Sequence, residues 1–211
     1  LSEHNLKAME SFRRKFPAVP LIHFLNPAYF TKSSPDKYRF LRRQIRRVIQ
    51  QGDELGLHLH GWKSLVQASG VTFRGTPRWD GVGKEFWCFT DCGYSVPISS
   101  YSFEELRRII AFSRNLLEDQ GFPRPRVFRA GGWMANDKLL RALVAEGFFA
   151  DSSAIPAVYL KGYSLQRIRG LLGKLWPEVD PYSQPFRRTF PEGSLFEFPK
   201  VLMFLRLFSY Q

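Results

Sequence analysis

The feature that most constrains the fold is a regular alternation of short apolar runs with longer segments of helical periodicity. The apolar runs have the length of β-strands and occupy residues 19–25, 54–60, 126–130, 148–151 and 195–198. Such alternation is typical of parallel βα units, so the sequence predicts an α/β fold. The pattern opens with a helix at residues 2–16, whereas a βα unit begins with a strand. We therefore expect the first strand of the fold to precede Leu1.

Three of the helical segments carry clear end signals. In residues 34–52, Ser34, Pro35 and Asp36 form a cap, a first-turn proline and a first-turn acid, and a glycine closes the segment. In residues 102–121, Ser102 and Glu105 have the spacing of a capping box. The third segment runs from Asn136 to Gly147, and a further helix is predicted for residues 164–175.

We expect a single domain over residues 1–211. Hydrophobic residues make up 44% of the chain, which is enough for a core and excludes wholesale disorder. Residues 63–100 interrupt the alternation with a stretch rich in glycine and aromatic residues, which predicts a long functional loop or insertion. No apolar run approaches the roughly 20 residues that span a membrane.

The chain has a formal net charge of +12, which favours an anionic partner such as an acidic glycan, nucleic acid or membrane headgroups. Five arginines lie between residues 39 and 47, but no helix-turn-helix or RNP-like pattern accompanies them, so we interpret them as a solvated helix face. Nucleic acid is therefore the less favoured partner. No signal peptide is visible at Leu1, and cytoplasmic and periplasmic or cell-envelope placements both stay open.

The chain contains two cysteines, Cys88 and Cys92, which are too few for a disulfide framework. Their spacing also differs from that of a zinc knuckle. Two ordinary loop thiols are the preferred interpretation, with a local disulfide or a metal contact as alternatives.

Polar and aromatic residues gather where the predicted strands end. Function collects at the carboxyl ends of strands in parallel βα folds, because these ends meet at one edge of the sheet. The four ends carry residues 26–29, 58–62, 129–133 and 151–153. Their coincidence is a stronger signal than any one motif.

His58 and His60 are the candidate metal ligands. Their two-residue spacing puts both imidazoles on the same face of an extended strand. Two converging neutral imidazoles suit a divalent metal, most readily Zn²⁺, although a catalytic site needs a third protein ligand. The alternative is one inward histidine that bonds a backbone carbonyl and one histidine at the surface.

Arg129 lies where a predicted strand leaves the core, and a buried arginine is costly in free energy unless it is paired. Asp151 lies on the next predicted strand, so we predict an ion pair between the two residues. Gly131 and Gly132 would allow backbone N–H groups to approach a ligand closely. Trp62 and Trp133 offer flat surfaces that suit either stacking on sugar rings or packing in the core.

The ordered set of residues 52–60, 128–132, 147–153 and 195–199 resembles the polysaccharide deacetylase (NodB-type) superfamily, over roughly residues 19–199. The resemblance implies a distorted, incomplete (β/α) barrel, although an open doubly wound sheet fits the alternation nearly as well. It also implies metal-dependent removal of acetyl groups from N-acetylated sugars of a glycan. Arg129 would match the family arginine that orients the catalytic aspartate, and Asp151 an aspartate of the supporting charge network.

The resemblance is divergent at three motifs. The family spaces its two histidine ligands four apart, and counting from His58 that second position is Trp62, so His60 would have to substitute. The family's aspartate pair, which includes the catalytic base, would precede Leu1, and the histidine that acts as general acid would follow Gln211. A glycan-binding relative without catalysis is therefore the main alternative, and a basic nucleic-acid-associated domain is a weaker one.

Overall fold

The computed structural model describes residues 3–32, 34–80, 91–160 and 166–200. Six strands form one sheet in the order β1-β2-β3-β4-β6-β5. The strands are β1 (Ile22–Leu25), β2 (Glu54–Leu59), β3 (Val127–Ala130), β4 (Ala150–Asp151), β5 (Phe186–Phe190) and β6 (Gly193–Glu197). All neighbouring pairs are parallel except β5 with β6, which is antiparallel. The predicted parallel α/β sheet is therefore present, and it is not closed into a barrel.

Seven α-helices lie in the described part of the chain, together with short 3₁₀ turns. They are α1 (Glu3–Lys15), α2 (Ala28–Thr31), α3 (Pro35–Val48), α4 (Lys63–Ala68), α5 (Phe103–Asp119), α6 (Asp137–Ala145) and α7 (Gln166–Leu175). Both parts of the capping box at Ser102 and Glu105 are formed at the start of α5. None of these helices is long and apolar enough to cross a membrane.

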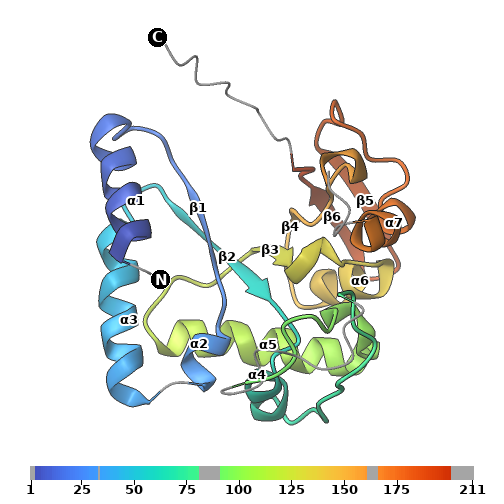
Figure 1. Cartoon of the computed structure of the whole chain (residues 1–211), viewed down its shortest axis with the longest axis horizontal. Helices are drawn as coiled ribbons and strands as arrows, with labels where there is room; N and C mark the ends of the chain where they lie inside the picture. Colours follow the sequence, from blue (N-terminus) through green and yellow to red (C-terminus); the bar gives the residue numbers. More distant parts are fainter. Residues whose placement is uncertain (1–2, 33, 81–90, 161–165, 201–211) are drawn as a thin grey trace.

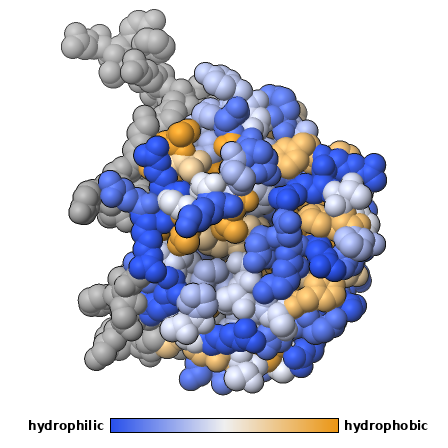
Figure 2. Space-filling view, turned by 90° about the vertical axis from the view of Figure 1, so that its right-hand side faces the viewer, coloured by the Kyte–Doolittle hydropathy of each residue, from blue (hydrophilic) through white to orange (hydrophobic). Residues whose placement is uncertain are grey.

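The helices surround the strands on three sides (Figure 1). Helices α1 and α3 lie beside β1 and β2, α5 runs below β2 and β3 in this view, and α6 and α7 lie beside the end of the sheet formed by β5 and β6. The side of the molecule that carries β5, β6 and α7 is a mixed surface on which hydrophilic residues predominate (Figure 2). This half-surrounded, open sheet is consistent with the expected incomplete barrel.

The two faces of the sheet have different environments. The outer face packs on the helices, where Leu57, Leu59 and Phe128 are fully buried in the core with α5 and α6. The inner face carries Phe24, Arg129 and Ser152, and these residues line a hollow of about 710 Å³. The register of β3 and β4 pairs Phe128 with Asp151, so Asp151 belongs to the outer face.

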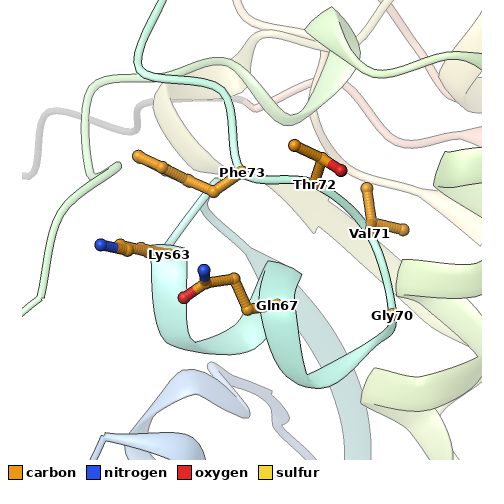
Figure 3. Close-up of a pocket in the computed structure, with 6 residues that line it drawn as sticks. All are labelled: Lys63, Gln67, Gly70, Val71, Thr72 and Phe73. Atoms are coloured by element: carbon orange, nitrogen blue, oxygen red, sulfur yellow. The ribbon is translucent and has the colours of Figure 1, made fainter.

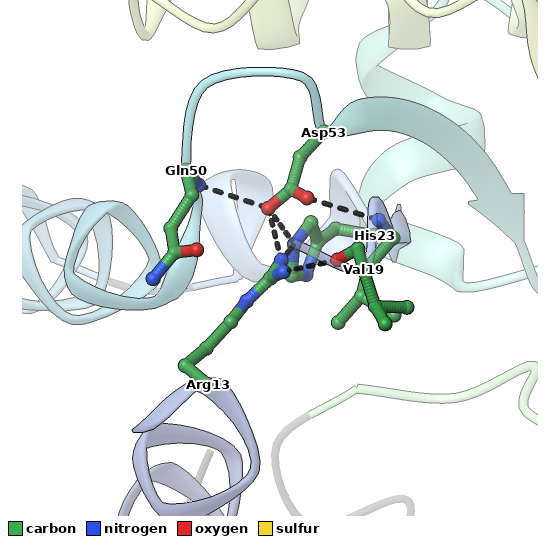
Figure 4. Close-up of polar contacts among 6 residues, drawn as sticks. Arg13, Val19, His23, Gln50 and Asp53 are labelled. Atoms are coloured by element: carbon green, nitrogen blue, oxygen red, sulfur yellow. Dashed lines mark hydrogen bonds and ion pairs between the residues drawn. The ribbon is translucent and has the colours of Figure 1, made fainter. Parts of the chain in front are cut away.

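The amino end of the sheet is held by a buried ion cluster (Figure 4). The Asp53 carboxylate accepts hydrogen bonds from the Arg13 guanidinium of α1, from His23 of β1 and from the backbone N–H groups of Leu21 and Gln50. The side chain of Asp53 is only 1% exposed. These hydrogen bonds overcome the opposing effect of burial and hold the pKa of Asp53 far below its usual range.

Candidate functional site

The candidate site lies at the carboxyl ends of β2 and β3. The strands are paired so that His58 lies beside Arg129. The rings of His58 and His60 are edge to face with 4.8 Å between their centroids, so the two imidazoles lie on one side of the strand, as their spacing predicts. The ring of His60 also lies near the Trp62 ring, with 6.2 Å between the two centroids. Two imidazoles and an indole thus form one cluster.

Hydrogen bonds fix which nitrogen of each histidine is free. Nδ1 of His58 lies 2.9 Å from the carbonyl oxygen of Arg129, and Nδ1 of His60 lies 2.9 Å from that of Tyr94. A carbonyl oxygen only accepts, so each Nδ1 carries the proton and donates. In the neutral ring the lone pair is then on Nε2, which is the arrangement that backbone partners impose on metal-binding histidines.

Both histidines are neutral at physiological pH. Burial lowers the pKa of His58, and the nearby Arg129 guanidinium adds to this effect. Burial lowers the pKa of His60 to about 4, with further contributions from His58 and Lys32. A neutral imidazole is the form that binds a metal, so neither ring has to lose a proton first.

The ring of His60 is held between neighbours that leave little freedom. It stacks on the Tyr94 ring with a centroid separation of 4.5 Å and an interplanar angle of 15°. It also lies directly on the backbone of Gly131, where an added Cβ would be 2.5 Å from Nδ1. Gly131 therefore has a role that the sequence did not reveal, because it makes room for an imidazole.

The long loop contributes two aromatic residues to the cluster. Tyr94 contacts both Trp62 and Trp79, with centroid separations of 5.6 and 5.7 Å. Trp79 and Tyr94 belong to the aromatic stretch of residues 63–100, and no pattern in the sequence connects them with the histidines. The backbone N–H of Lys63 donates to the carbonyl of Cys92, and this bond ties the later part of the loop to the residues that follow β2. Tyr94 is thereby held close to the histidines.

The predicted ion pair of Arg129 with Asp151 is not formed. Arg129 donates instead to the backbone oxygen and the hydroxyl of Ser152, at 3.1 and 2.9 Å. Its guanidinium also lies 4.1 Å from the centre of the Phe24 ring. The physical reason is the register of β3 and β4, which puts Arg129 and Ser152 on the inner face and Asp151 on the outer face.

Asp151 lies behind the sheet and supports the end of β3. Its side chain accepts from the hydroxyl and the backbone N–H of Ser153, at 2.8 and 3.0 Å. The Ser153 hydroxyl oxygen in turn accepts from the N–H of Ala130, immediately before Gly131. Asp151 is thus a positioning residue for the turn that carries the glycines.

Asp151 shares its buried position with Glu197, and both residues are 0% exposed. Burial and the neighbouring Asp151 raise the pKa of Glu197 well above its usual range. Glu197 Oε1 accepts from the N–H of Ala154, whereas Oε2 has no donor among the described residues. The pKa values of both carboxyl groups are raised, so the buried pair favours holding a proton over carrying two negative charges.

Because of the buried pair of Asp151 and Glu197, we expect the free energy of unfolding to fall as the pH rises. The folded protein keeps Glu197 protonated, whereas the unfolded chain ionises it near its ordinary pKa of about 4.3, so folding is favoured less with each pH unit above that value. The loss is up to about 1.4 kcal/mol per pH unit while only the folded state holds the proton. In Glu197→Gln an amide of the same shape can still accept from the N–H of Ala154 but has no titrating proton. Urea unfolding at pH 5 and pH 8 should show a smaller decline for this variant than for the wild type, and equal declines would contradict the shared proton.

The glycine turn after β3 is held in an uncommon conformation. Gly132 and Trp133 have φ angles of 62° and 60°, and such positive values are rare for a tryptophan. The indole N–H of the fully buried Trp176 donates to the carbonyl of Trp133 at 3.1 Å. This bond stabilises the turn at the edge of the site, a place where backbone strain is often functional.

The two imidazoles fit a divalent metal, but they supply only part of a site. Each has a fixed tautomer and an Nε2 lone pair, as Zn²⁺ requires. Among the described residues no group of three or more His, Cys, Asp or Glu side chains could hold a metal ion. The two carboxylate oxygens of Asp91, in the long loop, accept hydrogen bonds from the backbone N–H and the hydroxyl of Ser64, at 3.0 and 2.7 Å.

A second hollow of about 560 Å³ begins just after Trp62, beside α4 (Figure 3). Its lining consists of Lys63, Gln67, Gly70, Val71, Thr72 and Phe73. None of these residues is a histidine or an acid, so the hollow lacks the groups that hydrolysis or metal binding needs. The candidate catalytic chemistry therefore stays with the histidine pair.

Cys92 is disulfide-bonded, so the preferred interpretation of two ordinary thiols does not hold for it. Cys88, the other cysteine of the chain, lies outside the described residues. The local disulfide was one of the alternatives that the spacing left open.

Comparison with known proteins supports the fold. No protein family model and no curated protein sequence matches the chain. A crystal structure of a Mycobacterium smegmatis protein, assigned as a polysaccharide deacetylase, superposes with a TM-score of 0.52 and 15% sequence identity. The match covers 98% of this chain and 51% of the other, so this chain spans about half the length of its structural neighbour. At this identity the likeness shows a common fold.

Proposed function

We propose that this protein is a metal-dependent hydrolase that removes acetyl groups from the N-acetylated sugars of a polysaccharide. The observation that carries the proposal is the histidine pair at the carboxyl edge of the sheet, with each Nδ1 bonded to a backbone carbonyl and each Nε2 left as the free nitrogen. The fold shared with a protein assigned as a polysaccharide deacetylase supports the choice of substrate.

In this proposal His58 and His60 hold the divalent metal, for which Zn²⁺ is the best candidate. A metal of this kind polarises an amide carbonyl and lowers the pKa of water toward neutrality. Tyr94 and Gly131 hold the ring of His60 in place. Arg129 adds a positive charge beside His58, and the turn at Gly131 and Gly132 lies at the same edge of the sheet.

The general base and general acid are assigned to groups outside the described residues. Of the carboxylates described here, Asp151 and Glu197 are sealed behind the sheet, and Asp53 lies at its amino end. Asp80 and Asp91 are the described acidic residues of the loop, and Arg78 and Ser64 respectively donate to both of their carboxylate oxygens. The third metal ligand is assigned in the same way.

Zinc binding tests the proposal directly. The wild-type protein dialysed against Zn²⁺ should retain about one ion per chain, measured by elemental analysis. His58→Ala and His60→Ala should each weaken zinc binding at least about tenfold, since each removes one of few ligands. His23→Gln is the matched control, because His23 bonds Asp53 at the amino end of the sheet and should leave zinc binding unchanged. Equal zinc retention in all four proteins, or none in the wild type, would exclude the proposed centre.

A glycan-binding relative without catalysis is the second candidate. It is favoured by the absence of a three-ligand group among the described residues. Acetate release from N-acetylated oligosaccharides by the zinc-loaded full-length protein separates the two. Release that disappears in His60→Ala supports the hydrolase, whereas saturable glycan binding without release supports the relative.

A further inference from the structure

Each of the two candidate substrate-binding indoles, Trp62 and Trp133, carries a lysine on its ring. Nζ of Lys32 lies 3.9 Å from the centre of the Trp62 ring. Nζ of Lys200 lies 4.7 Å from the centre of the Trp133 ring. Both distances are within the range of cation–π contacts. The site therefore presents an ammonium group at each of these two indoles.

Neither ammonium forms an ion pair with a carboxylate of the described residues. In the described part of the chain no ion pair involves Lys32 or Lys200. Burial lowers the pKa of both lysines, and the charge of Asp91 only partly opposes this for Lys32. A half-buried ammonium that lacks a counter-ion gains most from a ligand that supplies one.

The two lysines flank the histidine pair. Lys32 is close enough to His60 for its charge to act on that ring, and it also lies 5.0 Å from the centre of the Tyr29 ring. On the other side, the positive charge of Arg129 is close enough to His58 and Lys200 to lower the pKa of each. Positive charge therefore continues along the edge from α2 past the histidines to the end of β6.

We propose that Lys32 and Lys200 bind carboxylate groups of an acidic glycan. This inference rests on the proposed function and narrows its substrate to a polysaccharide that carries both N-acetyl groups and carboxylates. The indole fixes each ammonium by its ring, and the N–H groups that point away from the ring remain free to donate to a carboxylate. Sugar rings would then pack beside the indoles rather than flat upon them.

The covered indoles argue against nucleic acid as the polymer. Single-stranded nucleic acid is held by bases that stack on open aromatic rings. At this edge lysines lie on Trp62 and Trp133, and His60 stacks on Tyr94. A polymer whose negative charges are carboxylates on non-planar rings fits this surface better.

Calorimetric binding of matched oligosaccharides tests the inference without relying on acetate release. The probes are a hexasaccharide of alternating N-acetylglucosamine and glucuronic acid and a neutral hexamer of N-acetylglucosamine. The full-length protein should bind the acidic probe at least about tenfold tighter, as expected for one or two charge-assisted hydrogen bonds. This preference should shrink as the salt concentration rises.

Lys32→Met and Lys200→Met remove the charge and keep an apolar stem on the indole. Each should weaken binding of the acidic probe about tenfold and leave the neutral probe unchanged. Lys174→Met on the exposed end of α7 is the matched control and should affect neither probe. Equal affinity of the wild type for the two probes, or unchanged binding in both site variants, would overturn the inference.

Two further outcomes separate this inference from the proposed function. Lysine-dependent binding of the acidic probe without acetate release would contradict the hydrolase and leave the acidic-glycan site standing. Acetate release from the neutral hexamer with no effect of either lysine would contradict the site and leave the hydrolase standing. Tighter binding of a thymidine hexanucleotide than of the acidic hexasaccharide would replace the glycan by nucleic acid.

Discussion

Asp53→Asn should destabilise the protein by about 3–5 kcal/mol, the effect of removing one partner from a buried ion pair. The carboxylate accepts four hydrogen bonds and neutralises Arg13, whose side chain is 5% exposed. An asparagine would leave the guanidinium of Arg13 without a counter-charge. Its amide N–H₂ would also face groups that themselves donate hydrogen bonds to the present carboxylate. Because the cluster joins α1, β1 and the start of β2, its loss should loosen the whole amino end of the sheet. Urea unfolding at pH 7 measures the change.

The same substitution at an exposed site provides the control for Asp53. Asp36 is 91% exposed and pairs with Arg39 within α3, so Asp36→Asn should change the unfolding free energy by less than about 1 kcal/mol. The depressed pKa of Asp53 also fixes the sign of the pH effect. Its stabilisation is complete above the ordinary carboxyl pKa of about 4 and is lost as the pH falls further, so the gap between wild type and Asp53→Asn should narrow in acid. Similar stabilities of the two asparagine variants at pH 7 would show that the cluster contributes little.

The fold was predictable where a local pattern was strong. The helical stripes and caps led to α3, α5 and α6, and the alternation of elements led to the parallel order of β1 to β4. The antiparallel strand β5 was not predicted, although residues 186–190 begin and end with phenylalanine and are followed by a Pro-Glu-Gly turn. The turn signal was present, but two arginines and a threonine made the run too polar for a search based on apolar strands.

The site was predictable only as far as spacing within one strand determines it. The contact between His58 and His60 follows from their separation in the sequence. The partner of Arg129 does not, because a register shift of one residue between strands decides whether Asp151 or Ser152 lies beside it. The lysines on Trp62 and Trp133 come from segments about 30 and 67 residues away in the sequence, and no local pattern connects them.

Gly131→Ala should damage the site more than its size suggests. An added Cβ would lie 2.5–2.7 Å from three atoms of the His60 ring, closer than van der Waals contact allows. The ring cannot yield easily, because it stacks on Tyr94 and bonds the Tyr94 carbonyl. We expect a destabilisation of about 1–3 kcal/mol from overpacking and, under the proposed function, zinc binding at least about tenfold weaker. Urea unfolding and zinc titration measure the two effects separately.

Gly170→Ala in α7 is the control for this change, because nothing lies within 4 Å of its added Cβ. A helical glycine replaced by alanine should make the protein more stable by about 0.5–1 kcal/mol and leave zinc binding unchanged. The two alanine variants therefore differ in sign as well as in size, which separates a steric effect at the histidine from a general effect of glycine replacement. If Gly131→Ala were as stable as the wild type and bound zinc equally well, the ring of His60 would have to be free to move. A freely moving ring would also remove the reason for treating the histidine pair as a preformed metal site.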